Sequence, residues 1–209
     1  MSSAAELLFQ RLLKNLRPLM AASGFRRRSQ NLICETPECW GVINVQKSRY
    51  SPVDEKSFTI NLAIASKRIL EYEGKSTSAP PPSYACHWAE IRIGSLMPDL
   101  KDKWWNLSDE ASYTSVEGEV RKALSDLAIP LIEPHLTEQG LLELWASKTP
   151  GSFEYPTLKC KSILLALQHR FEELPEIFQR IREICGGTLA EPGAEEHIAK
   201  LKKHFLLPE

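Results

Sequence analysis

Residues 40–64 read WGVINVQKSRYSPVDEKSFTINLAI, and this stretch decides the fold. Apolar and polar side chains alternate along residues 40–49 and again along residues 57–67, and the loop 51–54 separates the two segments. Such alternation is typical of antiparallel strands that bury one face. In the second segment the buried face is expected to carry Phe58, Ile60, Leu62 and Ile64. We therefore expect two antiparallel strands here.

The sequence on either side extends this sheet. A strand-like segment at 25–35 precedes it, and another at 84–93 follows it after the stiff, proline-rich connection 74–83. Leucines recur at helical spacing within residues 5–22, and Gly24 follows as a helix stop. The sequence thus predicts an N-terminal helix packed on an antiparallel sheet of at least four strands.

After the aromatic-rich segment 98–108 the pattern becomes helical to the end of the chain. Pro130 and Pro134 divide the first helical stretch, and Thr149-Pro150-Gly151 interrupts the second. Three short amphipathic helices are expected after this interruption. We predict an α+β protein with an α+β domain over residues 1–150 and a helical extension over residues 151–209.

Composition excludes several classes of protein. The chain has 209 residues, of which 43% are apolar and 25% are charged, with a net charge of −1. This balance predicts a folded core and gives no overall field to hold a polyanion. Five cysteines at irregular positions are expected to be reduced thiols. Without a signal peptide or a long apolar run, we expect a cytoplasmic protein with no membrane partner and no cofactor.

Uncharged amides interrupt the best strands. If the predicted strands are neighbours, the polar side chains project from the face opposite the core, within cross-strand reach of one another. This set is Asn44, Gln46, Asn61, Glu90 and Arg92. Amides offer donors and acceptors, and an arginine offers a fork for carboxylate or phosphate. We therefore expect a polar recognition surface for a partner, with Trp40, Trp88, Trp104 and Trp105 as aromatic anchors.

A structural interpretation of the same residues stands beside this one. The amides could form a solvated sheet face or a polar network under the C-terminal helices. A solvated strand face would use Lys, Glu and Thr more than Asn and Gln, which favours recognition. A register slip by one residue would bury the amides instead.

Metal binding and catalysis have weak support. Cys34-x4-Cys39 with Cys86-His87 could ligate zinc, but Cys86 and His87 point to opposite faces of a strand. Free thiols are the expected state. No catalytic motif occurs, although a Ser–His or Cys–His pair could form in three dimensions. We therefore name no catalytic or metal-binding residue.

One basic cluster remains, formed by Arg26–Arg28 with Lys47 and Arg49. Nucleic acid could use it, with Trp104 or Trp105 for stacking. Charges on a solvated edge strand, which discourage edge-to-edge pairing, are the commoner reason for such a cluster. The tryptophan pair is expected to anchor its loop by burying large rings.

Several short motifs carry a resemblance to a known family. They are GFRRR (24–28), WGVINVQKSRYS (40–51), SFTINLAI (57–64), RIGSL (92–96) and WW (104–105). Over about residues 8–135 the chain resembles the bacterial family called domain of unknown function 4304. The resemblance implies an α+β domain of bacterial type and carries over no catalytic residue. By analogy, small bacterial domains of this kind often neutralise toxins.

These observations favour non-catalytic binding of a protein partner. The specific hypothesis is a bacterial immunity protein, an antitoxin that neutralises a toxin by steric and electrostatic occlusion. Nucleic acid is disfavoured as a partner, and the oligomeric state is open. The alternative is a hydrolase or nucleic-acid-acting enzyme that uses the polar sheet face, with Gln46, Glu90 and Arg92 at its centre.

Overall fold

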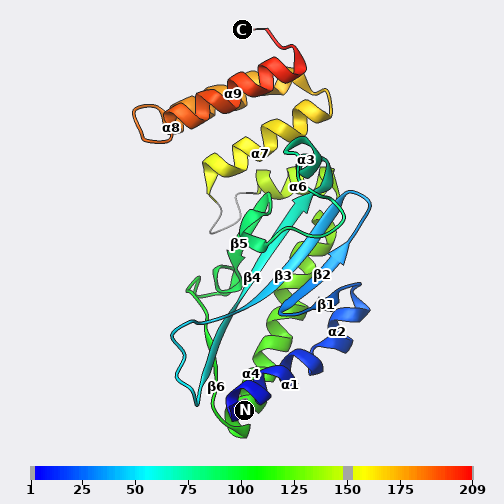
Figure 1. Cartoon of the computed structure of the whole chain (residues 1–209), viewed down its shortest axis with the longest axis vertical. Coiled ribbons are helices and arrows are strands. Elements are labelled where there is room, and N and C mark those ends of the chain that lie inside the picture. Colours follow the sequence, from blue (N-terminus) through cyan, green and yellow to red (C-terminus); the bar gives the residue numbers. More distant parts are fainter. Residues whose placement is uncertain (1–2, 148–152, 209) are drawn as a thin grey trace.

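An antiparallel sheet with helices on one face forms the larger part of the molecule (Figure 1). The computed structural model describes residues 3–147 and 153–208, without the side chains of Ala89 and Glu90. The strands are β1 (Arg26–Arg28), β2 (Asn31–Glu35), β3 (Cys39–Lys47), β4 (Lys56–Ser66), β5 (Trp88–Arg92) and β6 (Trp105–Leu107). They run in the order β1-β2-β3-β4-β5, and β6 pairs with the start of β4. This confirms the predicted α+β fold with its antiparallel sheet.

The helices follow the chain in three groups. Before the sheet lie α1 (Ala4–Asn15) and α2 (Arg17–Ala22), and α3 (Lys67–Tyr72) lies between β4 and β5. After β6 come α4 (Glu110–Ala123), α5 (Ile129–Ile132), α6 (Glu138–Ala146), α7 (Glu154–Leu167), α8 (Leu174–Cys185) and α9 (Glu191–Phe205). A π-helical segment, Leu124–Ala128, joins α4 to α5. Single 3-10 turns occupy Ser83–Ala85, Ile93–Leu96, Glu133–His135 and Phe171–Glu173. Pro18 lies in the first turn of α2, where the N-terminal helical stretch is divided into α1 and α2.

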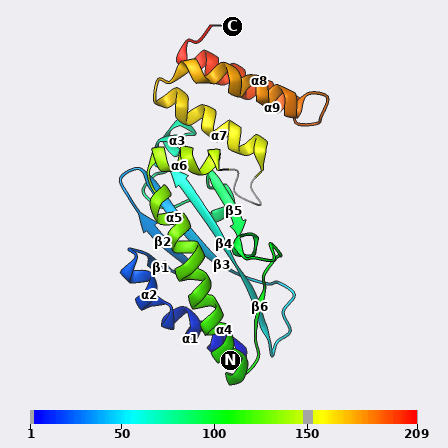
Figure 2. The ribbon, with the colours of Figure 1, turned by 180° about the vertical axis from the view of Figure 1, so that it is seen from behind.

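The sheet has an inner face, against which a layer of helices packs (Figure 2), and an outer face, whose small buried cluster includes Leu70 of α3 and Cys86 from the loop before β5. Helices α1, α2, α4 and α5 cover the inner face. The alternating residues of β4 predicted to face the core are fully buried there, namely Phe58, Ile60, Leu62 and Ile64. Burying each such side chain contributes about 1.5–3 kcal/mol. Gly41 allows close contact at this face, because a Cβ atom there would lie 2.9 Å from Leu136.

The predicted strand at 25–35 is a hairpin of two short strands. Arg26 pairs with Ile33 and Arg28 with Asn31, so β1 folds back antiparallel on β2. Ser29 turns the chain with φ 57°, a left-handed conformation that is uncommon outside glycine. The polar run from Arg26 to Asn31 has no apolar alternation, and so the sequence pattern did not reveal the turn.

A register shift between β4 and β5 changes the predicted position of Trp88. Arg92 pairs with Asn61 of the outer face, whereas Trp88 pairs with Ile64 of the inner face. Paired residues of an antiparallel sheet point to the same side. The prediction that Trp88 shares a face with Arg92 is therefore wrong. Trp88 is 2% exposed and belongs to the main core, because a bulge inserts an extra residue between the two positions.

The three C-terminal helices pack beyond one end of the sheet and do not lie over the outer face (Figure 1), part of which is covered by loop residues such as Thr77, whose carbonyl accepts from the Trp40 indole. Two contacts with α3 attach them: Arg68 donates to the backbone carbonyl of Leu167, and Tyr72 stacks on Phe205 at 6.1 Å between ring centroids. In α6, Glu138 accepts from Gln168 Nε2 at 3.1 Å. The division into domains at residue 150 stays a prediction, and residues 148–152 lie outside the described ranges.

Candidate functional site

A row of polar side chains crosses the outer face from one edge of the sheet to the other. Strand register places Arg28 opposite Asn31, Asn31 opposite Asn44, Asn44 opposite Asn61 and Asn61 opposite Arg92. We call these five residues the polar row. It has three amides at its centre and an arginine at each end. The sequence analysis identified its last three members but missed Arg28 and Asn31, because the β1–β2 turn was not foreseen.

The amides of the polar row are hydrogen-bonded to one another. Asn61 Nδ2 donates to Asn44 Oδ1 at 3.2 Å and to Gln46 Oε1 at 2.8 Å. Asn44 Nδ2 in turn donates to Asn31 Oδ1 at 2.6 Å. Asn61 is 1% exposed, so the expectation that every amide is open to a partner is not met at Asn61. Gln46 is exposed and Asn44 is half-buried, and the amides thus form a rigid, internally bonded floor.

At the β5 end, the arginine of the polar row is neutralised within the chain. Arg92 Nη1 lies 2.7 Å from Asp102 Oδ2, and its guanidinium lies 5.1 Å from the centre of the Trp104 ring. Burial opposes ionisation of Asp102, but hydrogen bonds from Arg92 and Trp104 outweigh it and lower the pKa of this carboxyl. This end of the row therefore has few groups left for a partner.

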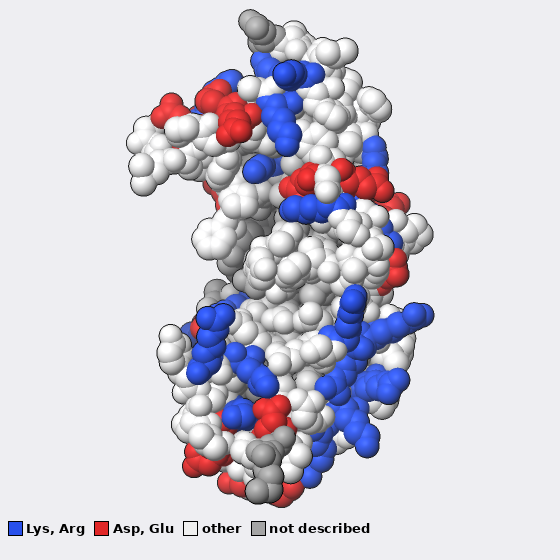
Figure 3. Space-filling model, in the orientation of Figure 1, with Lys and Arg blue, Asp and Glu red and all other residues white. Residues whose placement is uncertain are grey.

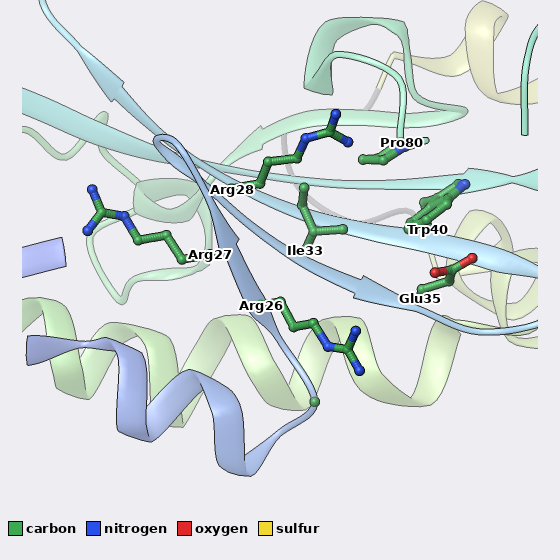
Figure 4. A pocket seen from close by; sticks show the side chains of 8 residues that line it. Arg26, Arg27, Arg28, Ile33, Glu35, Trp40 and Pro80 are labelled. Carbon is green, nitrogen blue, oxygen red and sulfur yellow. The ribbon is translucent and has the colours of Figure 1, made fainter. Parts of the chain in front are cut away.

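At the β1 end, two arginines border an open cavity of about 410 Å³. We call it the arginine pocket; its lining residues are Gly24, Arg26, Arg27, Arg28, Ile33, Glu35, Trp40 and Pro80. Figure 4 shows the side chains of Arg26 and Arg28 directed to the side where Trp40 and Pro80 lie, and that of Arg27 directed away from it. The backbones of Arg26 and Arg28 pair with β2, but neither guanidinium forms an ion pair or hydrogen bond within residues 3–147 and 153–208.

The electrostatics of the arginine pocket favour anions. Its one acidic lining residue, Glu35, is already paired with Lys67, with Nζ 2.7 Å from Oε1. Lys67 Nζ also lies 4.8 Å from the centre of the Trp40 ring. Figure 3 shows Lys and Arg side chains gathered on the part of the outer face where β1 lies, beside a largely uncharged band. Two unpaired guanidinium groups therefore give this side of the face a local positive charge.

The predicted aromatic anchors have different environments. Trp40 is on the outer face and is 5% exposed, and its indole donates to Thr77 O at 3.2 Å. Trp105 is buried, stacks on Phe58 at 5.7 Å and donates to Glu119 at 3.1 Å. Trp104 is half-buried beside Arg92. Only Trp40 and Trp104 thus reach the outer face, while Trp105 and Trp88 anchor the core.

The structure describes the side chains of two of the three residues considered for an enzyme centre and of the cysteines considered for a metal site. Gln46 and Arg92 have partners within the chain, and the side chain of Glu90 lies outside the described part of the structure. Burial raises the pKa of the Cys39 thiol to about 12, which keeps it protonated at neutral pH. Among the described residues, no three His, Cys, Asp or Glu side chains gather where they could hold a metal ion.

A Ser–His pair does form, but it is buried between α7 and α9. Ser162 Oγ and His197 Nε2 lie 2.8 Å apart, and Ser162 Oγ donates to Lys159 O at 2.8 Å. The single hydroxyl proton is thereby used, so His197 donates to Ser162 and is not positioned as its base. Burial, followed by the charges of Lys159 and Lys200, lowers the pKa of His197 from 6.5 to about 4.

This pair predicts a loss of stability in mild acid. The unfolded chain protonates His197 near pH 6.5 and the folded chain only near pH 4, so acidification favours the unfolded state between these values. The full effect is about 3 kcal/mol. Urea unfolding of the wild type and of His197→Gln, at pH values from 7 to 4, measures this effect as a change in the difference between their free energies of unfolding. The contributions of carboxylates that both proteins share cancel in that difference. Parallel pH profiles for the two proteins would contradict the assignment.

Fold and site together define an α+β domain whose outer sheet face carries a polar row and an arginine pocket. The chain belongs to the family described as Domain of unknown function (DUF4304), which matches residues 16–134. The whole polar row and the whole arginine pocket lie within the matched part, whereas α6 to α9 follow it. No curated protein and no solved structure matches the chain. In the described ranges, every helix is too short or too polar to traverse a lipid bilayer.

Proposed function

We propose that this chain is a non-catalytic binding domain whose outer sheet face binds an acidic surface of a protein partner. The observation that carries the proposal is that the side chains of Arg26 and Arg28 are exposed and unpaired at the β1 edge of the outer face. Two basic residues elsewhere on the sheet are already neutralised within the chain, Arg92 by Asp102 and Lys103 by Glu119. An acidic partner surface would supply the missing charges, which favours fast and selective association.

The bonded amides support binding more than chemistry. Their donors and acceptors are used to hold β2, β3 and β4 in register at the outer face. A face whose side chains are fixed in advance loses little conformational entropy when a partner binds. The overall charge of −1 also limits long-range attraction to nucleic acid and leaves a local basic patch for a protein of complementary shape.

Toxin neutralisation is the specific form of this proposal. The partner would be a toxin, and the outer face would occlude its functional surface by steric and electrostatic contact. The unpaired arginines set a condition on such a toxin: its contact surface has to be acidic where it meets β1. A toxin with a basic contact surface would be repelled by Arg26 and Arg28.

Affinity capture tests the proposal. The tagged chain is used as bait in a lysate of the organism that encodes it, together with two charge-reversed baits, and captured proteins are identified by mass spectrometry. Arg26→Glu/Arg28→Glu should lose a partner that the wild type and Arg27→Glu both retain. Arg27 is the matched control because it lies on the same strand, is equally exposed, and points away from the pocket.

Two results would contradict the proposal. The first is capture that is the same for all three baits, which would place binding elsewhere on the molecule. The second is capture of nucleic acid in place of protein, seen as loss of the retained material after nuclease treatment. Circular dichroism of each bait establishes that the reversed charges leave the fold intact.

A further inference from the structure

The arginine pocket has the features of a small-molecule site. Its volume of about 410 Å³ falls within the ~300–1,000 Å³ range of pockets that hold small ligands. Charged and apolar groups occupy different parts of it. Figure 4 shows Ile33 between Arg28 and Trp40, and Pro80 above Trp40. A ligand that fits these walls has an anionic end and an apolar body.

The two arginines favour a phosphate over a carboxylate. Arg26 and Arg28 are two positions apart on one strand, so their Cα atoms are about 6.5–7 Å apart and their side chains leave the same face. A carboxylate carries one negative charge and two acceptor oxygens, which leaves one of the two guanidinium charges unbalanced, whereas a phosphate monoester carries a charge of about −1.5 to −2 and three acceptor oxygens. Because neither arginine has a partner within the described ranges, a dianion fits both.

The apolar wall indicates what the phosphate is attached to. Ile33 and Trp40 border the pocket and belong to a small hydrophobic cluster on the outer face, separate from the main core. The indole N–H of Trp40 is engaged by Thr77, so this wall offers apolar contact and no free donor. A flat or apolar group beside the phosphate would cover it, and inorganic phosphate would leave it uncovered.

We propose that the arginine pocket binds a small organic phosphate monoester, with the phosphate between Arg26 and Arg28 and an apolar or aromatic body against Ile33, Trp40 and Pro80. This site goes beyond the proposed function because it needs no protein partner. The same chemistry occurs in phosphorylated aromatic compounds and in nucleotides, and two probes distinguish these sources.

Isothermal titration calorimetry on the full chain tests the site, with phenyl phosphate and adenosine 5′-monophosphate as probes. For ligands of this size we expect a Kd on the order of 100 µM. Phenol, adenosine and inorganic phosphate should each bind at least about tenfold more weakly, because each lacks one half of the proposed contacts. The tighter of the two esters identifies the source of the ligand.

Matched variants separate this site from general charge attraction. Arg26→Ala/Arg28→Ala should weaken binding of the better ester at least about tenfold, and Arg49→Ala, at an exposed arginine outside the pocket lining, should change it less than about twofold. Three results would overturn the inference: no saturable binding of either ester, equal binding of inorganic phosphate, or equal loss in both variants. If one of these results is obtained and partner capture still depends on Arg26 and Arg28, the ligand site is refuted but the proposed protein-binding function is not.

Discussion

Gly94→Ala is expected to destabilise the fold by about 3 kcal/mol. A Cβ atom at this position would lie 2.0 Å from the backbone oxygen of Lys101 and 2.6 Å from the backbone nitrogen of Lys103. These are backbone atoms, so the segment that contains them has to move as a unit. That segment accepts a hydrogen bond from Thr59 at 2.8 Å and supplies Asp102, which pairs with Arg92. Urea unfolding measures the loss.

Gly118→Ala is the matched control for this substitution. Gly118 is exposed within α4, and nothing lies within 4 Å of a Cβ atom there. Alanine in an open helical position stabilises by about 0.5–1 kcal/mol relative to glycine. The same chemical change should therefore have opposite signs at the two sites. If Gly94→Ala left the stability unchanged, the segment 101–103 would not lie close to Gly94.

Asn61→Asp is expected to cost about 2 kcal/mol at neutral pH. The substitution keeps the shape of the side chain but places an oxygen where Nδ2 donates to Asn44 and Gln46. Three oxygens would then face one another at a site that is closed to water. Arg92 lies opposite, but its guanidinium is held by Asp102 and gives little relief.

The pH dependence of this variant identifies the cause. Burial beside two acceptors should raise the pKa of the new carboxyl. Above that pKa the carboxylate destabilises the folded protein by the full amount. On acidification the cost decreases, because the protonated acid can donate a hydrogen bond. Urea unfolding of variant and wild type at pH 7 and pH 4 measures the change in their difference. Asn106→Asp is the control, since this exposed amide already accepts from Ser57 at 2.6 Å. An equal cost at both positions would refute the bonded amide floor.

Periodicity predicted the fold because burial follows it directly. The structure confirms the buried face predicted by the leucine spacing in α1 and the inner face predicted by the alternation in β4. The expectation that β4 buries only one face is wrong, because Thr59, Asn61 and Ala63 on its other face are buried as well. Short elements with no such pattern were missed, including α3 and β6. The sequence of β1 consists only of arginine, so its pairing depends on the turn at Ser29 and not on hydrophobic contrast.

The site was only partly predictable for a related reason. Alternation placed Asn44, Asn61 and Arg92 on one face, and pairing confirms that placement. Their hydrogen bonds depend on register, which one sequence does not specify for polar positions. The arginine pocket joins residues from both sides of the β1–β2 turn with Pro80 from a distant loop, and no local pattern connects them.

The most direct test of the outer face as a binding surface is the affinity of the purified partner for two charge-reversed proteins. Relative to the wild type, Arg26→Glu/Arg28→Glu should raise the Kd about 100-fold, and Arg27→Glu should raise it by no more than about threefold. Equal Kd values for the two variants would contradict the account, because position on the strand would then have no influence and Arg26 and Arg28 would not contact the partner.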